Sequence, residues 1–492
     1  MMSAVFPLLE ASPVNLRYVA ALRGIVPTDS GTPFTYVQTG IFDPEDLMRL
    51  ALSNPEGRFL GILENPLAAE KAQENTNKRK LTNLSFGDPA SEIPSKIDFL
   101  CHDTPQKMLS QKERLALFDQ TEKHLAQGGL FCLRYKTATT EDSLLQYLIA
   151  EYVPELSRAQ TEGFLQELRV LGQTYFAGHP ISLTALEKAL ETKTPESFFE
   201  NCAATEQPVS GSFETLAGLL PRGFAYAGDA SVSANYLELT VSQQAQEPLL
   251  KYKKHLLYES FKDFTLTRLV RSDVWARMPV NSSVNKPELF NTFTFGITKN
   301  KEDLPAQIDM LNGTQLDLKT PLFSNLIDLM TKLPLSVGDF LSHPTGKDFA
   351  GDDVLASIQI LVAAGIAQPM RARYEGRQEK EATLVPTQGI NNFLNHITIA
   401  TTSVRIASPV AGNAITFSAR NALVLQAISR VGLDLSAGAL FSELETLSKQ
   451  NPALASKIMD AAEPSHEMAD TMLHSVINEE VERWYAYGLM AA

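Results

Sequence analysis

Residues that follow two short apolar strands near the start of the sequence are placed where they could contact a ligand. Phe34–Gln38 and Phe59–Leu63 are rich in aromatic and branched residues, and a helix-length segment separates them. Strands joined in this way are parallel, and such pairs bind ligands at their carboxyl ends. We therefore expect the carboxyl ends of these two strands to form a ligand-binding edge.

The helix between these strands begins with its own negative charge. Asp43 is a strong N-cap, Pro44 suits the first helical position, and Glu45 follows in the first turn. Carboxylates at a helix N-terminus are stabilised by the helix dipole. These side chains therefore take the place that the carboxylate of a ligand would otherwise occupy.

A second group of chemically capable residues lies near the C-terminus. His466, Asp470 and His474 follow one another at intervals of four, so one side of a helix would present all three to a metal ion. Such spacings arise by chance in a chain with eight histidines, and we expect no metal site. The sequence has no GxxxxGK[ST] phosphate loop and no GxSxG nucleophile motif, and it predicts neither of those enzyme classes.

Composition limits the partners of this chain. A length of 492 residues predicts roughly three domains. The net charge of −14 makes nucleic acid and anionic membranes poor general partners, although it permits a basic protein. Cys101 and Cys132 lie in strand-like runs and are expected to be buried thiols. With no apparent signal peptide or membrane-spanning stretch, we expect a cytoplasmic protein.

The rest of the first half alternates between strands and helices, which is typical of an α/β fold. Further strands are predicted at Thr82–Phe86, Lys96–Cys101 and Leu130–Tyr135, the last after a tight turn that contains Gly128 and Gly129. A helical stretch follows, and then a late strand with Asp229 in the loop after it. The segment from 248 to 278 is interpreted as helix-like.

Four regions are predicted along the chain. Residues 1–277 form the α/β domain with a helical insertion, and 278–319 a linker region. Residues 320–390 contain three short helices and a return segment through Glu375, an order typical of a winged helix. Its third helix, DDVLASIQILVAAG, has no Lys or Arg, so we interpret this unit as a protein-contact module. Residues 391–492 are mainly helical after a small hairpin and end in an aromatic cluster.

The segments FTYV, SNPEGRFLGI and ENP resemble class I S-adenosylmethionine-dependent methyltransferases. The most similar group carries a methyltransferase regulatory domain and includes bacterial protein-lysine methyltransferases. The resemblance implies a Rossmann-like domain, S-adenosylmethionine as the cofactor and a protein as the substrate. It also implies that Arg268 and Arg271 belong to a motif that closes the first domain, where we expect them to form structural salt bridges.

The resemblance also implies where a cofactor would be held. Gly40 is the retained glycine of the family's loop, and Leu63 stands where the family has the acidic residue that holds the ribose hydroxyls, with Glu64 next to it. Asp88 matches a position beside the adenine, and Asp103 falls in the segment near the methyl group. The candidate cofactor-binding residues are Gly40, Glu64, Asp88 and Asp103, with no catalytic residue assigned.

The departures from the family pattern predict a degenerate cofactor site. Phe42 and Pro44 replace glycines that let the backbone approach a ligand, and aromatic residues expected after Asp103 are absent. We expect Phe42 and Leu63 to fill the space of the cofactor, and His102 to be a loop residue without a special role.

The predicted function is that of a non-catalytic homologue, a pseudoenzyme. It would regulate or bind either an active methyltransferase paralogue or a target protein. S-adenosylmethionine is the only cofactor the resemblance suggests, and none is required. Two alternatives remain: an active methyltransferase acting on a protein side chain such as lysine, and an interaction scaffold that works through the C-terminal modules.

Overall fold

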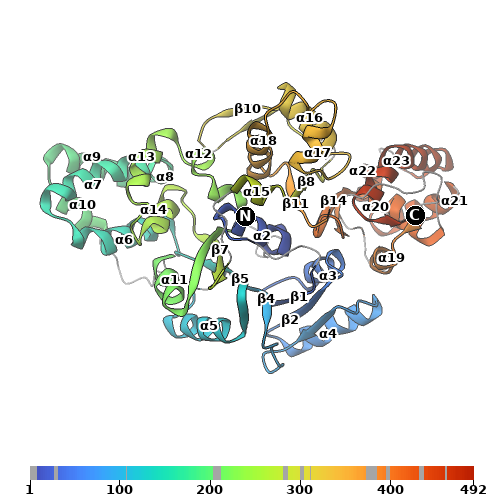
Figure 1. The fold of residues 1–492 in the computed structure, drawn as a ribbon, viewed down its shortest axis with the longest axis horizontal. Helices are drawn as coiled ribbons and strands as arrows, with labels where there is room; N and C mark the ends of the chain where they lie inside the picture. Colours follow the sequence, from blue (N-terminus) through green and yellow to red (C-terminus); the bar gives the residue numbers. More distant parts are fainter. Residues whose placement is uncertain are drawn as a thin grey trace.

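A seven-stranded sheet lies at the centre of this protein, whose structure here is a computed structural model (Figure 1). The strand order is β3-β2-β1-β4-β5-β7-β6. The first five are parallel, and β7 runs antiparallel to β5 and β6. The strands are β1 (Phe34–Gly40), β2 (Gly57–Ile62), β3 (Leu84–Gly87), β4 (Ile97–Thr104), β5 (Leu125–Lys136), β6 (Phe224–Asp229) and β7 (Val270–Arg277). The structure describes residues 8–26, 32–106, 108–202, 212–280, 286–299, 304–310, 312–372, 385–394, 399, 401–431, 437–459 and 463–491.

The predicted Rossmann-like unit is confirmed. Asp43 caps helix α3 by accepting a hydrogen bond from the Glu45 N–H (2.9 Å). Cys101 and Cys132 are buried in the sheet, as expected. The helices between the parallel strands are α3 (Pro44–Ser53), α4 (Pro66–Lys78) and α5 (Gln111–His124), and α1 (Leu8–Ala11) and α2 (Pro13–Leu22) precede the sheet.

Two local predictions are wrong. The segment interpreted as helix-like contains the short helix α14 (Tyr258–Thr265) and then strand β7. Six of the eight residues of β7 are buried, on both faces of the sheet, so the strand has no alternating pattern of buried and exposed residues. The residues around Gly128 form a bulge inside β5, because the register shifts between Ile97 and Phe99 of β4. A glycine with a φ of +76° accommodates the extra residues within the strand.

The helical insertion packs around its own apolar core on one side of the sheet (Figure 1). Phe164, Leu168 and Phe261 are among its buried side chains. Its helices are α6 (Glu141–Tyr152), η1 (Val153–Glu155), α7 (Arg158–Leu171), α8 (Gln173–Gly178), α9 (Pro180–Thr192), α10 (Pro195–Cys202), α11 (Ser212–Leu219), η2 (Leu220–Arg222), η3 (Val232–Asn235), α12 (Leu237–Thr240), α13 (Gln243–Lys251) and α14.

The middle module combines the three expected helices with strands from the expected linker. Strand β8 pairs antiparallel with β11, so a segment before residue 319 completes this module. The predicted return is described as far as Ala372, and the winged-helix assignment stays a prediction. The elements are α15 (Lys286–Phe290), β8 (Thr294–Gly296), β9 (Gln307–Asp309), β10 (Gln315–Asp317), α16 (Pro321–Met330), α17 (Val337–Ser342), α18 (Gly351–Ala363) and β11 (Gln368–Met370).

The C-terminal module begins with the predicted hairpin and is otherwise mainly helical. The hairpin lies against α3, since the Ser53 hydroxyl donates to the Asn413 carbonyl (2.8 Å) and the Asn54 amide to the Gly412 carbonyl (2.9 Å). Trp484 is buried in the module's core. The elements are β12 (Val385–Pro386), α19 (Gln388–Leu394), β13 (Ser403–Ser408), β14 (Asn413–Ser418), α20 (Ala419–Val431), α21 (Ala437–Gln450), α22 (Pro452–Met459), α23 (His466–Ala486) and β15 (Met490–Ala491).

No described helix has both the length and the apolar character needed to cross a membrane.

Tyr487 joins the C-terminal and middle modules, and its removal gives a first prediction. Its buried hydroxyl lies within hydrogen-bonding distance of the carbonyl oxygens of Ile297 (2.9 Å) and Met330 (3.1 Å). We expect Tyr487→Phe to weaken this contact by about 1 kcal/mol, because it leaves a buried carbonyl with fewer donors. The effect is measured as faster hydrogen exchange of the Ile297 backbone amide.

Tyr258→Phe is the control, because the described residues provide no hydrogen bond to the Tyr258 hydroxyl. Unchanged exchange at Ile297 in Tyr487→Phe would contradict the expectation.

Candidate functional site

Gly40 and Asp103, two of the four predicted site residues, lie together at the carboxyl edge of the sheet. They are register partners of β1 and β4, and the next backbone N–H, of Ile41, donates to the Asp103 carbonyl (2.8 Å). Gly40 has a φ of +89°, and a Cβ added there would lie 2.2 Å from the Asp103 carbonyl oxygen. The close approach of β1 to β4 therefore requires a glycine at this position, whether or not a cofactor binds.

The N-terminus of α3, which faces this edge, is occupied by the chain's own carboxylates. The Asp43 side chain caps the helix, and Glu45 pairs with Arg79 (2.6 Å). An uncapped helix N-terminus attracts the anionic group of a ligand. Here Asp43 already satisfies one of the free N–H groups and contributes a negative charge.

Apolar side chains are buried where β1 and β2 end. Phe42 is 8 % exposed and Leu63 is 7 % exposed, and both belong to one buried cluster that includes residues of α3 and α4. Glu64, the neighbouring candidate, is exposed to solvent. The two apolar side chains thus lie in the protein interior, while Glu64, which the resemblance offers as a ribose ligand, is exposed.

Asp88 uses its carboxylate to close its own turn. It accepts hydrogen bonds from the Ala90 N–H (3.0 Å) and the Ser91 hydroxyl (3.1 Å). It lines a groove of about 370 Å³ beside α4, and the lining of this groove does not include Gly40, Glu64 or Asp103. The four candidate residues all follow or end neighbouring strands, but the structure pairs only Gly40 with Asp103 directly.

His102 is not the loop residue that was predicted: it lies in β4 and has a structural partner. Its Nδ1 lies 2.7 Å from the Thr39 hydroxyl on the adjacent strand. Burial lowers the pKa of His102 to about 4, so its imidazole is neutral at physiological pH. The adjacent Asp103 is buried beside Arg134 of β5, at 3.6 Å.

Sequence reasoning missed Glu10, the carboxylate with the most unusual environment at this edge. Its side chain accepts a hydrogen bond from the Ser272 hydroxyl on β7 (3.0 Å). Burial and then the nearby Asp229 raise the pKa of Glu10 to about 7, against the opposing effects of Ser272, Arg134 and Arg268. An isolated Glu in the apolar run FPLLEAS was the only sign of it in the sequence.

Glu10 also lines a cavity of about 420 Å³ at the junction of the modules. Ala367 of the middle module and Arg405 and Thr416 of the C-terminal hairpin line the same cavity. Because Glu10 lies more than 350 positions before the other three residues, no sequence pattern could have placed it beside them.

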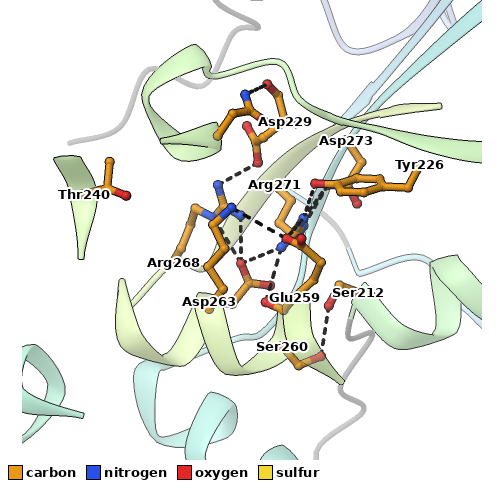
Figure 2. Close-up of polar contacts among 12 residues, drawn as sticks. Ser212, Tyr226, Asp229, Thr240, Glu259, Ser260, Asp263, Arg268, Arg271 and Asp273 are labelled. Carbon is orange, nitrogen blue, oxygen red and sulfur yellow. Dashed lines mark hydrogen bonds and ion pairs between the residues drawn. The ribbon is translucent and has the colours of Figure 1, made fainter. Parts of the chain in front are cut away.

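Arg271 and Arg268 form the predicted salt bridges, within a larger buried network (Figure 2). Arg271 donates to Glu259, Asp263 and Asp273, each at 2.8 Å. Arg268 pairs with Asp263 (2.9 Å) and Asp229 (2.6 Å). Asp229 is thus not the loop residue that was predicted: it ends β6 and is buried.

The network sets the charge states of its members. Burial raises the pKa of Asp273 to about 6, while Arg271 opposes the shift. Burial also raises the pKa of Glu259, but Lys262 and Arg271 outweigh it and hold the value at about 2. Removing one partner from such a buried group typically costs about 3–5 kcal/mol, because an uncompensated charge remains.

The histidines near the C-terminus do not form a cluster. His474 lies 3.5 Å from Asp470, whereas the His466 ring stacks on Phe441. Within the described ranges, no three His, Cys, Asp or Glu side chains are placed to hold a metal ion.

The close approach at Gly40 gives a second prediction. We expect Gly40→Ala to lower the free energy of unfolding by more than about 2 kcal/mol, because it adds a steric clash to the strain of a positive φ. Gly128→Ala is the matched control: its φ is also positive, but no atom lies within 4 Å of an added Cβ, so about 1 kcal/mol is expected. Urea unfolding measures both, and equal losses would contradict a steric role of Gly40.

Glu10 gives a third prediction, on pH dependence. Its pKa is about 7 in the folded chain against 4.5 as the ordinary value, so the folded state holds a proton that the unfolded state loses first. The unfolding free energy therefore falls between about pH 4.5 and 7, by up to about 3 kcal/mol from this group. Glu10→Gln should remove this part of the decline in urea unfolding at pH 5 and pH 8. Glu64→Gln, which removes an exposed carboxylate, is the control, and an identical decline in Glu10→Gln and the parent chain would contradict the assignment.

Comparisons with known proteins agree with this geometry. Residues 212–277, from α11 to β7, match a family model described as a predicted methyltransferase regulatory domain. No curated protein matches the sequence. PKMT2 from Rickettsia typhi is similar in structure, with a TM-score of 0.62 and 13% sequence identity, over 98% of this chain and 99% of that chain. Its complex with AdoHcy gives a TM-score of 0.59 at 13% identity, over 98% of each chain. The chain therefore has the fold of class I methyltransferases, and its residues 212–277 are similar to a methyltransferase regulatory domain.

Proposed function

We propose that this chain is a non-catalytic methyltransferase homologue that acts through a protein partner. The observation that carries the proposal is the loop after β1, where Phe42 is buried and Asp43 caps α3. A class I cofactor site needs an open, glycine-rich loop and a helix N-terminus free to meet an anion. In this chain both positions are taken by its own side chains.

Energetics support weak cofactor binding. With Leu63 in place of an acidic residue, the ribose hydroxyls would lose their acceptor, at about 1–3 kcal/mol for each unpaired group. Two such losses correspond to roughly a 30-fold to 20,000-fold drop in affinity. A cofactor that binds other methyltransferases at micromolar concentration would then bind here at about millimolar concentration.

A protein partner follows from the modules that are retained. The likeness to PKMT2 extends over nearly the whole chain, including the regulatory and C-terminal modules. The net charge of −14 favours a partner with a basic surface, through steering and complementarity. We therefore infer that the partner is either an active methyltransferase paralogue or a basic target protein.

A second candidate function is an active protein methyltransferase, with lysine as its target side chain. The whole-length likeness to the AdoHcy complex of PKMT2 favours it. Glu10 also favours it, because a carboxylate with a pKa of about 7 beside a cavity at the carboxyl edge is suited to accept a proton from an amine.

Titration calorimetry with S-adenosylmethionine and AdoHcy distinguishes the two functions. The non-catalytic function predicts no measurable heat or a dissociation constant near 1 mM or weaker. Micromolar binding of S-adenosylmethionine would instead support the second candidate, provided that Glu64→Ala abolishes it and Glu162→Ala does not. Glu162 is an exposed residue of α7 and serves as the control.

A further inference from the structure

A pocket of about 550 Å³ lies within the regulatory segment, away from the residues that align with the cofactor site. Its lining includes Tyr226 of β6, Lys253 after α13, Lys262 of α14 and Arg23 after α2. The volume is within the range of about 300–1,000 Å³ that small-molecule sites occupy. Its size, polar lining and position therefore make it a candidate ligand site.

Lys262 is the most unusual residue of this pocket. Its side chain is only 5 % exposed, and its one ion-pair partner among the described residues is Glu259, at 3.9 Å, which is too far for a hydrogen bond. The same Glu259 oxygen accepts a 2.8 Å hydrogen bond from Arg271. The Lys262 ammonium is thus nine-tenths buried, lines the pocket and is left without a hydrogen-bond acceptor in the part of the chain that is described.

Three other donors line the same pocket. The Arg23 guanidinium lies over the Tyr226 ring, 5.7 Å from its centroid, and has no ion pair with a described carboxylate. The Tyr226 hydroxyl accepts from Arg271 (2.9 Å), which leaves its own proton available. Lys253 is exposed and has no ion pair within the described ranges. Positive charge and free donors thus converge, while Glu238 is the one lining carboxylate outside the network.

The remaining walls are apolar or aromatic. Tyr226 and Tyr258 contribute rings, and Leu216 contributes an aliphatic wall. Leu250 (46 % exposed) and Leu256 (57 % exposed) also line the pocket, although large aliphatic side chains are usually covered. These surfaces would gain from contact with an apolar ring in a ligand.

We propose that this pocket binds a small organic anion, a carboxylate or a phosphate monoester attached to a planar ring, with the anionic group at Lys262 and Arg23. Charge-assisted hydrogen bonds from a buried ammonium and a guanidinium are the strongest that such a site offers. Burial lowers the pKa of Lys262, and the bound anion supplies the partner that stabilises its charged form. The proposal does not depend on whether the cofactor site is active.

Calorimetric titration of the full chain with phenyl phosphate and with benzoate tests the proposal and separates the two sources of negative charge. We expect saturable binding of at least one, with a dissociation constant at or below about 1 mM. Phenol, which has the ring without the charge, and inorganic phosphate, which has the charge without the ring, should each bind at least tenfold more weakly.

Matched variants assign the binding to this pocket. Lys262→Met should weaken binding at least tenfold, because Glu259 keeps Arg271 as its partner while the anion loses its buried ammonium. Lys254→Met, which removes an equal charge from an exposed lysine outside the lining, should leave binding unchanged. If Lys262→Met does not fold by circular dichroism, the exposed Arg23→Gln replaces it, with an expected loss of at least threefold. Absence of binding by both probes, or equal affinity in the folded variant and the parent chain, would refute the proposal.

Discussion

The ion pairs around Arg271 hold the sheet and the helical insertion together. Its guanidinium, on β7, reaches Glu259 and Asp263 of α14 and Asp273 of its own strand, all at 2.8 Å. Each of these groups would be costly to bury alone, and each is stable because the others are in place. The position of α14 against β7, and with it the geometry of the regulatory segment, is therefore fixed by a set of charges that must fold together.

The buried ion pairs also explain why the segment that contains β7 was wrongly predicted to be helical. The strand Val270–Arg277 carries Arg271 and Asp273 in its interior, and charged residues in a buried strand contradict the usual apolar pattern. Glu259 and Asp263, which pair with Arg271, lie on the separate helix α14, so periodicity within the strand reveals nothing of these ion pairs. By contrast β1, α3 and β2 were predictable, because an Asp-Pro helix start and short apolar runs encode them locally.

The candidate site also combines features that the sequence encodes locally with features that only long-range contacts create. Gly40 and Asp103 lie at the carboxyl ends of adjacent parallel strands, so their proximity could be inferred once the strand order was known. The environment of Glu10 could not be, because it is created by Ser272 on β7 together with Asp229 and Arg134 from two other strands. Long-range packing decides its pKa, and no local pattern encodes that packing.

The presence of Gly40 in this fold does not depend on whether a cofactor binds. Gly40 is required because the Asp103 carbonyl of β4 approaches it, and this requirement holds in an empty site as well as in a filled one. No comparable backbone contact requires Phe42 or Leu63 at its position, and both side chains are apolar and buried. Gly40 therefore argues neither for nor against a bound ligand, whereas Phe42 and Leu63 are the positions on which the proposed loss of cofactor binding rests. The function proposed for this chain needs the scaffold and its modules, and it does not need methyl transfer.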